Sequence, residues 1–234
     1  MTLAATLVGM AGGNWLADLT PLAGGTVTNG SLAGAITSTG GTVNNIAGTT
    51  SLTNSSGTTT LTGTNAYTGA TTVNGGTLTA GAANAFSANS ATKVNNGGTL
   101  NLGGFAQSIN ALSLAGGTVT NGPLTGAITS TGGTVNNISG TASLTNTSGT
   151  TTLTGTNGYT GATTVNGGTL TAGAANALSS GSATTVNAPG TLNLNSYNQT
   201  IGSLAGTGAV TLGSGTLTTG GSANTAYSGA MTGT

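Results

Sequence analysis

Apolar and polar residues alternate one by one in short runs along this chain, and most runs follow a Gly-Thr pair. Clear examples are Thr26-Val27-Thr28, Thr42-Val43-Asn44 and Thr77-Leu78-Thr79. A period of two among β-branched residues, bounded by Gly and Asn, is typical of short strands and not of helices. The strong helix formers Glu, Lys, Arg and Gln are almost absent, which favours the same interpretation.

The Gly-Thr pairs return at intervals of 16 to 22 residues, and no helical pattern lies between them. They begin at Gly25, Gly41, Gly57, Gly76, Gly98, Gly117, Gly133, Gly149, Gly168 and Gly190. Strands at this spacing predict the coils of a parallel β-solenoid, each stacked about 4.8 Å from the last. We therefore expect an all-β fold, a parallel β-helix of about 11–12 coils of 16–22 residues.

A longer repeat contains these coils. Residues 22–112 align without a gap on residues 114–204, and 72 of the 91 positions are identical. Repetition at this length indicates a modular array. We expect one five-coil unit at 22–113, a second at 114–203 and a partial third unit, with an incomplete coil, at 204–234. Residues 1–21 precede the repeats and are expected to form a cap or an inter-subunit segment.

Stacked coils place equivalent residues in columns along the solenoid. The apolar residue of each run is expected to face inward, which predicts a core ladder of Val27, Val43, Leu61, Leu78, Leu100, Val119, Val135, Leu153, Leu170 and Leu192. The threonine that follows each glycine is expected to face outward, in a surface ladder that begins with Thr26, Thr42, Thr58, Thr77 and Thr99.

The composition excludes most catalytic chemistry. Gly, Thr, Ala, Asn and Ser make up 178 of the 234 residues, while Asp18 is the only acid and Lys93 the only base. General acid-base catalysis needs a His, a carboxylate pair or a tuned Lys, and metal sites need several Cys, His or acidic ligands. The chain has no His, Cys, Glu or Arg. We expect no enzyme activity, no catalytic residues, no cofactor and no metal.

The same composition limits the partners. Nucleic-acid binding depends largely on Lys and Arg at phosphates, so a chain with one Lys is not expected to bind nucleic acid. No window reaches the 18 apolar residues typical of a membrane helix, so no membrane span is expected in this chain. Net charge is zero, which favours self-association over solubility.

Two blocks carry a resemblance to a known family. SGTTTLTGTNAYTGATTVNGGTL at 56–78 and SGTTTLTGTNGYTGATTVNGGTL at 148–170 resemble the passenger-associated repeat of bacterial autotransporter proteins. The pattern is a Gly-Thr-Leu strand, then Asn-x-Tyr-Thr-Gly, then Thr-x-Val-x-Gly-Gly-Thr-Leu. SGTLTTGGSANTAYSGAMTGT at 214–234 resembles the opening of another copy. The resemblance implies a right-handed β-helical stalk on the cell surface or released from it.

Three functions are compatible with these sequence features. The first is a structural protein of the bacterial surface or extracellular space, a rod that stacks head-to-tail into a homopolymer or forms part of a longer passenger stalk. The second is an adhesin passenger that binds glycan or a host surface, with the variable segment 81–93 as its loop. The third is an ice-binding solenoid that uses the threonine ladder.

Several aromatic and apolar residues are candidates for contacts. Trp15 is expected to cap the first coil or to contact another subunit, and Tyr227 and Met231 are inter-subunit candidates in the incomplete coil. Tyr67 and Tyr159 occupy equivalent positions and have two interpretations, a stacked platform for a ligand or a loop anchor packed on the solenoid wall.

Overall fold

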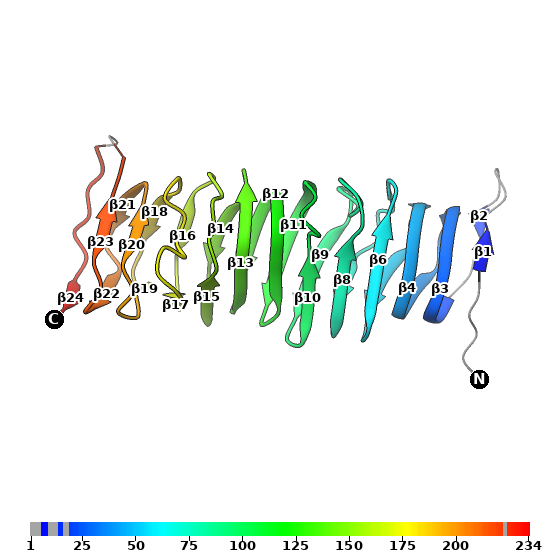
Figure 1. Cartoon of the computed structure of the whole chain (residues 1–234), viewed down its shortest axis with the longest axis horizontal. Helices are drawn as coiled ribbons and strands as arrows, with labels where there is room; N and C mark the ends of the chain where they lie inside the picture. Colours follow the sequence, from blue (N-terminus) through cyan, green and yellow to red (C-terminus); the bar gives the residue numbers. More distant parts are fainter. Residues whose placement is uncertain (1–5, 9–13, 16–18, 222–223) are drawn as a thin grey trace.

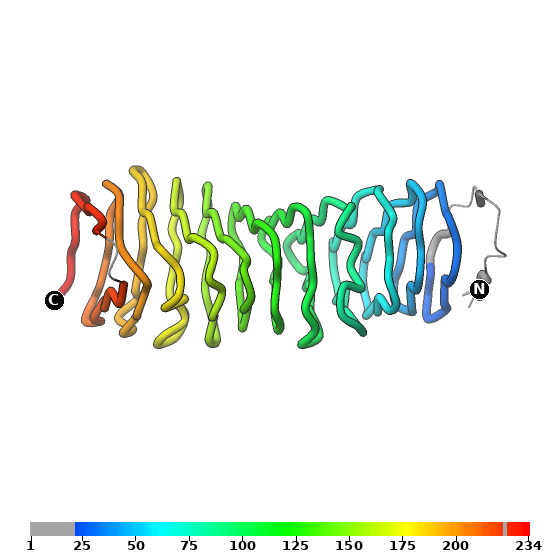
Figure 2. The backbone as a smooth tube through the Cα atoms, turned by 90° about the horizontal axis from the view of Figure 1, so that it is seen from above, coloured from blue at the N-terminus to red at the C-terminus, as the bar shows by residue number. Residues whose placement is uncertain are grey.

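The computed structural model is an elongated rod in which the strands follow one another in sequence order along the long axis (Figure 1). It describes residues 6–8, 14–15, 19–221 and 224–234, with side chains described from residue 22 onward. The backbone winds in about twelve turns, which the tube drawing shows as successive coils (Figure 2). The predicted all-β parallel solenoid is confirmed; its right-handed sense stays a prediction.

Strands on one side of the rod, called face 1, contain the Gly-Thr runs. Each strand of face 1 between the first and the last pairs in parallel with the strand one coil before it and the strand one coil after it. The stack consists of β1 (Thr6–Val8), β3 (Leu19–Leu32), β4 (Ala35–Gly48), β6 (Thr58–Thr62), β8 (Gly76–Ala80), β10 (Gly98–Asn101), β12 (Thr118–Ser130), β13 (Gly133–Gly140), β15 (Thr150–Thr154), β17 (Thr169–Ala172), β19 (Thr191–Asn193), β22 (Ala209–Gly213) and β24 (Met231–Gly233).

A second stack, face 2, begins with the first residues of β3 and β4, which pair with each other, and includes the last residues of β12. All of its ladder pairs are parallel as well. Its other strands are β5 (Ser51–Asn54), β7 (Thr71–Val73), β9 (Ala91–Asn95), β11 (Gln107–Ala115), β14 (Ser143–Asn146), β16 (Thr163–Val165), β18 (Ala183–Val186) and β21 (Ser203–Gly206).

The third side, face 3, is less regular because several coils cross it as loops. It contains β2 (Asn14–Trp15), which pairs with the end of β3, and the pair formed by β20 (Gln199–Ile201) and β23 (Leu217–Thr219). The ends of β3 and β4 also pair here, as do the middle of β12 and the end of β13. Coils that cross face 3 as loops account for most of the variation in coil length.

In the coils whose strand continues from face 1 onto face 3, asparagine makes the turn between the two faces. Asn45 has a φ of 52° and Asn137 a φ of 52°. Asn adopts this left-handed conformation more readily than other non-glycine residues. The Asn45 side chain also accepts a hydrogen bond from the Thr64 backbone N–H of the next coil, at 2.9 Å. One residue therefore bends its own coil and holds the following one.

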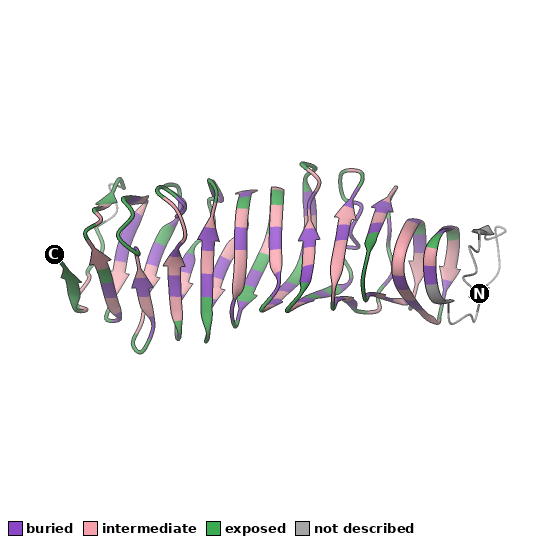
Figure 3. Cartoon of the chain, turned by 60° about the horizontal axis from the view of Figure 1, so that its bottom comes forward, coloured by how far each residue is buried: buried purple, intermediate pink, exposed green. Residues whose placement is uncertain are grey.

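The core is a narrow strip that runs the length of the rod. Buried and more exposed residues alternate along the strands (Figure 3). In β7 and in β16, one outward threonine stands between two buried residues. Leucine, isoleucine and valine form most of this strip, and Tyr67 and Tyr159 are its largest fully buried side chains.

Because each coil contributes only a few inward side chains, the loss of one should be costly. We expect Leu100→Ala, at a position with no exposed surface, to lower the free energy of unfolding by about 2–4 kcal/mol. The outward neighbour Thr99→Ala should change it by about 0.5 kcal/mol or less. Urea unfolding followed by circular dichroism measures both, and equal effects would contradict the inward orientation of Leu100.

Candidate functional site

The ten residues of the expected core ladder are all buried, but they do not form one column. Leu61 lies beside Val43, as expected, while its neighbour on the other side is Ala80. Leu78 lies instead beside Thr59. The second unit repeats this two-residue offset between β15 and β17. The buried residues are Val27, Val43, Leu61, Leu78, Leu100, Val119, Val135, Leu153, Leu170 and Leu192.

The offset arises because β6 turns a threonine into the core. Thr59 is fully buried, and its hydroxyl lies 2.6 Å from the Ser38 hydroxyl and also hydrogen-bonds the Asn54 side chain. Asn54 in turn donates to the Gly75 carbonyl of the next coil at 2.6 Å. The sequence carries a signal for this: Leu61 stands four residues after its glycine, whereas Val43 stands two residues after its own.

The same offset divides the expected surface ladder into two columns. Thr26 lies beside Thr42, whose next neighbour is Thr60. Thr58 lies beside Thr77 and begins a separate column, which corrects its expected place after Thr42. This second column has threonine in seven consecutive coils: Thr58, Thr77, Thr99, Thr118, Thr134, Thr152 and Thr171.

Face 2 carries a column that has no two-residue offset. The sequence did not predict it, because the face 2 strands lack the Gly-Thr signal. It holds a hydroxyl at nearly every coil and a lysine at one of them. Its members are Thr37, Thr53, Thr72, Lys93, Ser113, Thr129, Thr145, Thr164, Thr185 and Ala205. Two residues earlier in each coil, alanine or serine forms a parallel column of small side chains, with Ala91, Ala111 and Ala127 at its centre.

The two equivalent tyrosines anchor face 3 loops from inside the rod. Tyr67 is 1% exposed, and its hydroxyl lies 2.7 Å from that of Thr71. Thr71 lies 2.8 Å from the Ser90 hydroxyl, which donates to the Gly69 carbonyl at 2.8 Å. Tyr159, with Thr163 and Ser182, repeats the arrangement. A ring enclosed in this way cannot serve as a stacking platform for a ligand.

The asparagine two residues before each tyrosine joins three consecutive coils. Asn65 accepts a hydrogen bond from the Ile46 N–H at 2.9 Å in the coil before it. It donates to the Thr62 carbonyl at 3.1 Å in its own coil and to the Ala85 carbonyl at 2.8 Å in the next. Asn157 makes the equivalent bonds in the second unit. The Asn-x-Tyr sequence therefore sets the path of an irregular loop.

A family model for the passenger-associated transport repeat matches residues 53–80 and 148–172, which enclose these two Asn-x-Tyr loops. The chain carries two passenger-associated transport repeats. Both matched ranges contain a strand of face 1, the anchored loop, a strand of face 2 and the next strand of face 1, and the first range also includes the end of β5. No curated protein and no solved structure matches this chain.

Passenger-associated transport repeats belong to autotransporter passengers, and they indicate a secreted or cell-surface location. Within the residues that the structure describes, there is no helix with the length and apolar character to cross a membrane.

The inter-subunit candidates lie at the two ends of the repeat array. Trp15 belongs to β2, where its backbone pairs with Leu32, but its side chain lies outside the described residues. Tyr227 is partly buried, and its hydroxyl lies within hydrogen-bond distance of two carbonyl oxygens, that of Gly208 at 2.8 Å and that of Ala230 at 2.9 Å. Met231 is 47% exposed on β24. Of the two side chains that the structure describes, that of Met231 is the more exposed.

The tyrosines of the repeats should make stability sensitive to alkaline pH. Burial raises the pKa of Tyr67 to about 12 and that of Tyr159 to about 12, against the opposing effect of the hydrogen bonds from Thr71 and Thr163. The folded chain therefore holds both phenolic protons at a pH where the unfolded chain has released them. Their stabilising contribution is complete below about pH 10 and is lost as pH rises towards about 12.

We expect the free energy of unfolding to fall by roughly 2–3 kcal/mol per tyrosine across this interval. Urea unfolding at a series of pH values from 8 to 12 measures the change. The matched control is the Tyr67→Phe, Tyr159→Phe double variant, which keeps the rings and leaves Thr71 bonded to Ser90. An equal alkaline loss in parent and control would contradict the assignment.

Proposed function

We propose that this chain is a non-enzymatic structural rod of the bacterial cell surface or extracellular space, and that it forms part of an autotransporter passenger stalk. The carrying observation is the unbroken series of parallel strand pairs on face 1 from β1 to β24. A backbone joined to itself in this way holds its length without a thick core. The two transport repeats support the location.

The interior and the surface both suit this role. Among the described residues, every buried side-chain nitrogen or oxygen has a hydrogen-bond partner, so the polar groups inside the rod are committed to its structure. Outward positions carry mainly threonine, serine, asparagine and alanine, and charge is almost absent. With one acid and one base in the whole chain and no histidine, very few groups are available for general acid-base catalysis.

Head-to-tail stacking into a filament is the alternative form of the same proposal. β24 pairs with β22 along one edge, and no described strand pairs with its other edge. Its three residues are all exposed, Met231 among them. A strand edge of this kind can accept a strand from another copy. Residues 1–21 as a cap or inter-subunit segment, and the unit boundaries at 113 and 203, stay predictions.

Negative-stain electron microscopy of the pure chain across a dilution series tests the proposal. Twelve coils at about 4.8 Å predict single rods of roughly 50–60 Å. Rods of this length at every concentration would support the stalk and overturn the filament. Long fibres that disappear in Met231→Pro, which removes an N–H donor from the free edge of β24, would support the filament. Round particles with no long axis would overturn both forms.

A second candidate function, binding to ice, is favoured by the seven-coil threonine column of face 1. Its hydroxyls and methyls repeat at about 4.8 Å on a rigid sheet. If the column binds ice, the chain should show thermal hysteresis that Thr99→Tyr with Thr118→Tyr abolishes. Thr145→Tyr with Thr164→Tyr, on face 2, is the control. A parent chain without hysteresis would exclude this function.

A further inference from the structure

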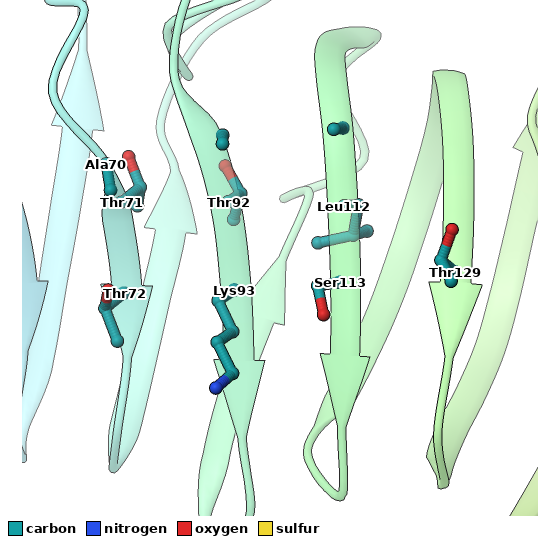
Figure 4. A pocket seen from close by; sticks show the side chains of 10 residues that line it. Ala70, Thr71, Thr72, Thr92, Lys93, Leu112, Ser113 and Thr129 are labelled. Atoms are coloured by element: carbon teal, nitrogen blue, oxygen red, sulfur yellow. The ribbon is translucent and has the colours of Figure 1, made fainter. Parts of the chain in front are cut away.

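Lys93 supplies the only positive side-chain charge of the chain, and it stands in the outward column of face 2. Its strand, β9, pairs with β7 on one side and with β11 on the other. This places Lys93 between Thr72 and Ser113, as Figure 4 shows. The lysine is exposed, and the side chains beside it in the column are hydroxyls.

A shallow, open depression of about 270 Å³ adjoins this lysine. It extends along the rod over parts of four successive coils, from Ala70 to Thr129. Small side chains make room for it, because the neighbouring outward column has alanine in each of these coils. Its surface is mainly apolar, and Ala70, Ala91 and Ala111 line it. The adjoining column adds the hydroxyls of Thr72 and Ser113 and the ammonium group of Lys93.

The second unit provides a similar scaffold without the charge, with Ala205 in place of Ser113 and Ser203 in place of Ala111. Position 185 is the equivalent of 93 and carries threonine, in the same column and with threonine again beside it at Thr164. The inward neighbours are unchanged, since Thr92 and Val94 correspond to Thr184 and Val186. Differences between the units are concentrated here: 13 of the 19 fall within residues 86–111. The core of this region is nearly constant while its surface differs.

The chemistry of the depression selects an elongated anionic ligand. A single exposed ammonium group attracts a carboxylate, and the described part of face 2 offers no acidic side chain to compete for it. The flanking hydroxyls can donate and accept hydrogen bonds, while the alanine methyls form a flat apolar strip. A sugar chain has hydroxyl edges and apolar C–H faces, and it advances by about one coil spacing per residue.

We propose that this depression binds a carboxylate-bearing polysaccharide that lies along the rod axis, with one carboxylate on Lys93 and its hydroxyls on Thr72 and Ser113. The site rests on the extracellular location proposed above, but it does not depend on whether the rods are stalks or filaments. Nucleic acid would require several cations, and an anionic membrane would require a basic cluster. An acidic glycan, in contrast, needs only one lysine, which pairs with one of its carboxylates.

The test is an NMR titration of the isotope-labelled full chain with an alginate hexasaccharide, and with a neutral glucose hexasaccharide as comparison. The acidic sugar should shift signals of β7, β9 and β11, and the neutral sugar should shift them only at about fivefold higher concentration. Lys93→Thr should weaken binding about fivefold, the upper end for one exposed ion pair, and should remove its salt dependence. Lys93→Arg should retain binding within about twofold.

The second unit gives the matched control. Thr185→Lys with Ala205→Ser should add a second site, with shifts in β16, β18 and β21. Adding Lys93→Thr to these two changes should move binding there. Equal binding of neutral and acidic sugars, or full binding by Lys93→Thr, would overturn the proposal. So would Lys93-dependent binding of phosphatidylserine vesicles without binding of alginate. If rods persist in electron microscopy while no shift occurs, the site alone fails and the structural role stands.

Discussion

Backbone hydrogen bonds between consecutive coils are the interaction on which the rest of this structure depends. On face 1 every strand between β1 and β24 has a parallel partner on both sides, so the pairing runs the length of the described rod. Each coil is too thin to bury much apolar surface alone, and stacking gives it a shared core. The small residues of this sequence serve that geometry, because close coils leave little space between neighbouring backbones. A Cβ added at Gly76, for example, would lie 2.1 Å from the backbone carbonyl oxygen of Gly57 in the preceding coil.

The polar interior follows from the same constraint. A thin core cannot exclude every hydroxyl or amide, and a buried polar group is costly unless it is hydrogen-bonded. Thr59, Asn54 and Ser38 meet this requirement by bonding to one another, and Asn65 does so by bonding three successive coils. In this chain, the passenger-associated transport repeat thus holds an irregular loop in place within a regular stack of coils. Its most recognisable residues, Asn65 and Tyr67, lie inside the rod, which leaves the outer faces free to vary.

Variation on those faces does not disturb the stack. Lys93 and Thr185 occupy equivalent outward positions, while the inward residues on either side of them are the same in both units. Outward side chains in a parallel sheet contact mainly their neighbours in the column, so a threonine can become a lysine at little cost to the core. A rod built in this way can acquire a binding surface in one unit while the other keeps the plain scaffold.

The sequence by itself determined the solenoid, because the period of two within each run and the return of Gly-Thr pairs at 16–22 residues leave few other arrangements for so little apolar surface. It also determined that Leu100 and the other apolar residues of the runs face inward. The register between coils was decided only in the tertiary structure. Thr58 and Thr60 are both outward threonines of one strand, and the run alone does not say which lies beside Thr42. That choice depends on Thr59, whose hydroxyl reaches Ser38 and Asn54 in the neighbouring face 2 strands and thereby selects the pairing. The column of face 2 that holds Lys93 was likewise invisible along the chain, because coils of unequal length bring its members together through backbone pairing and not through a constant spacing.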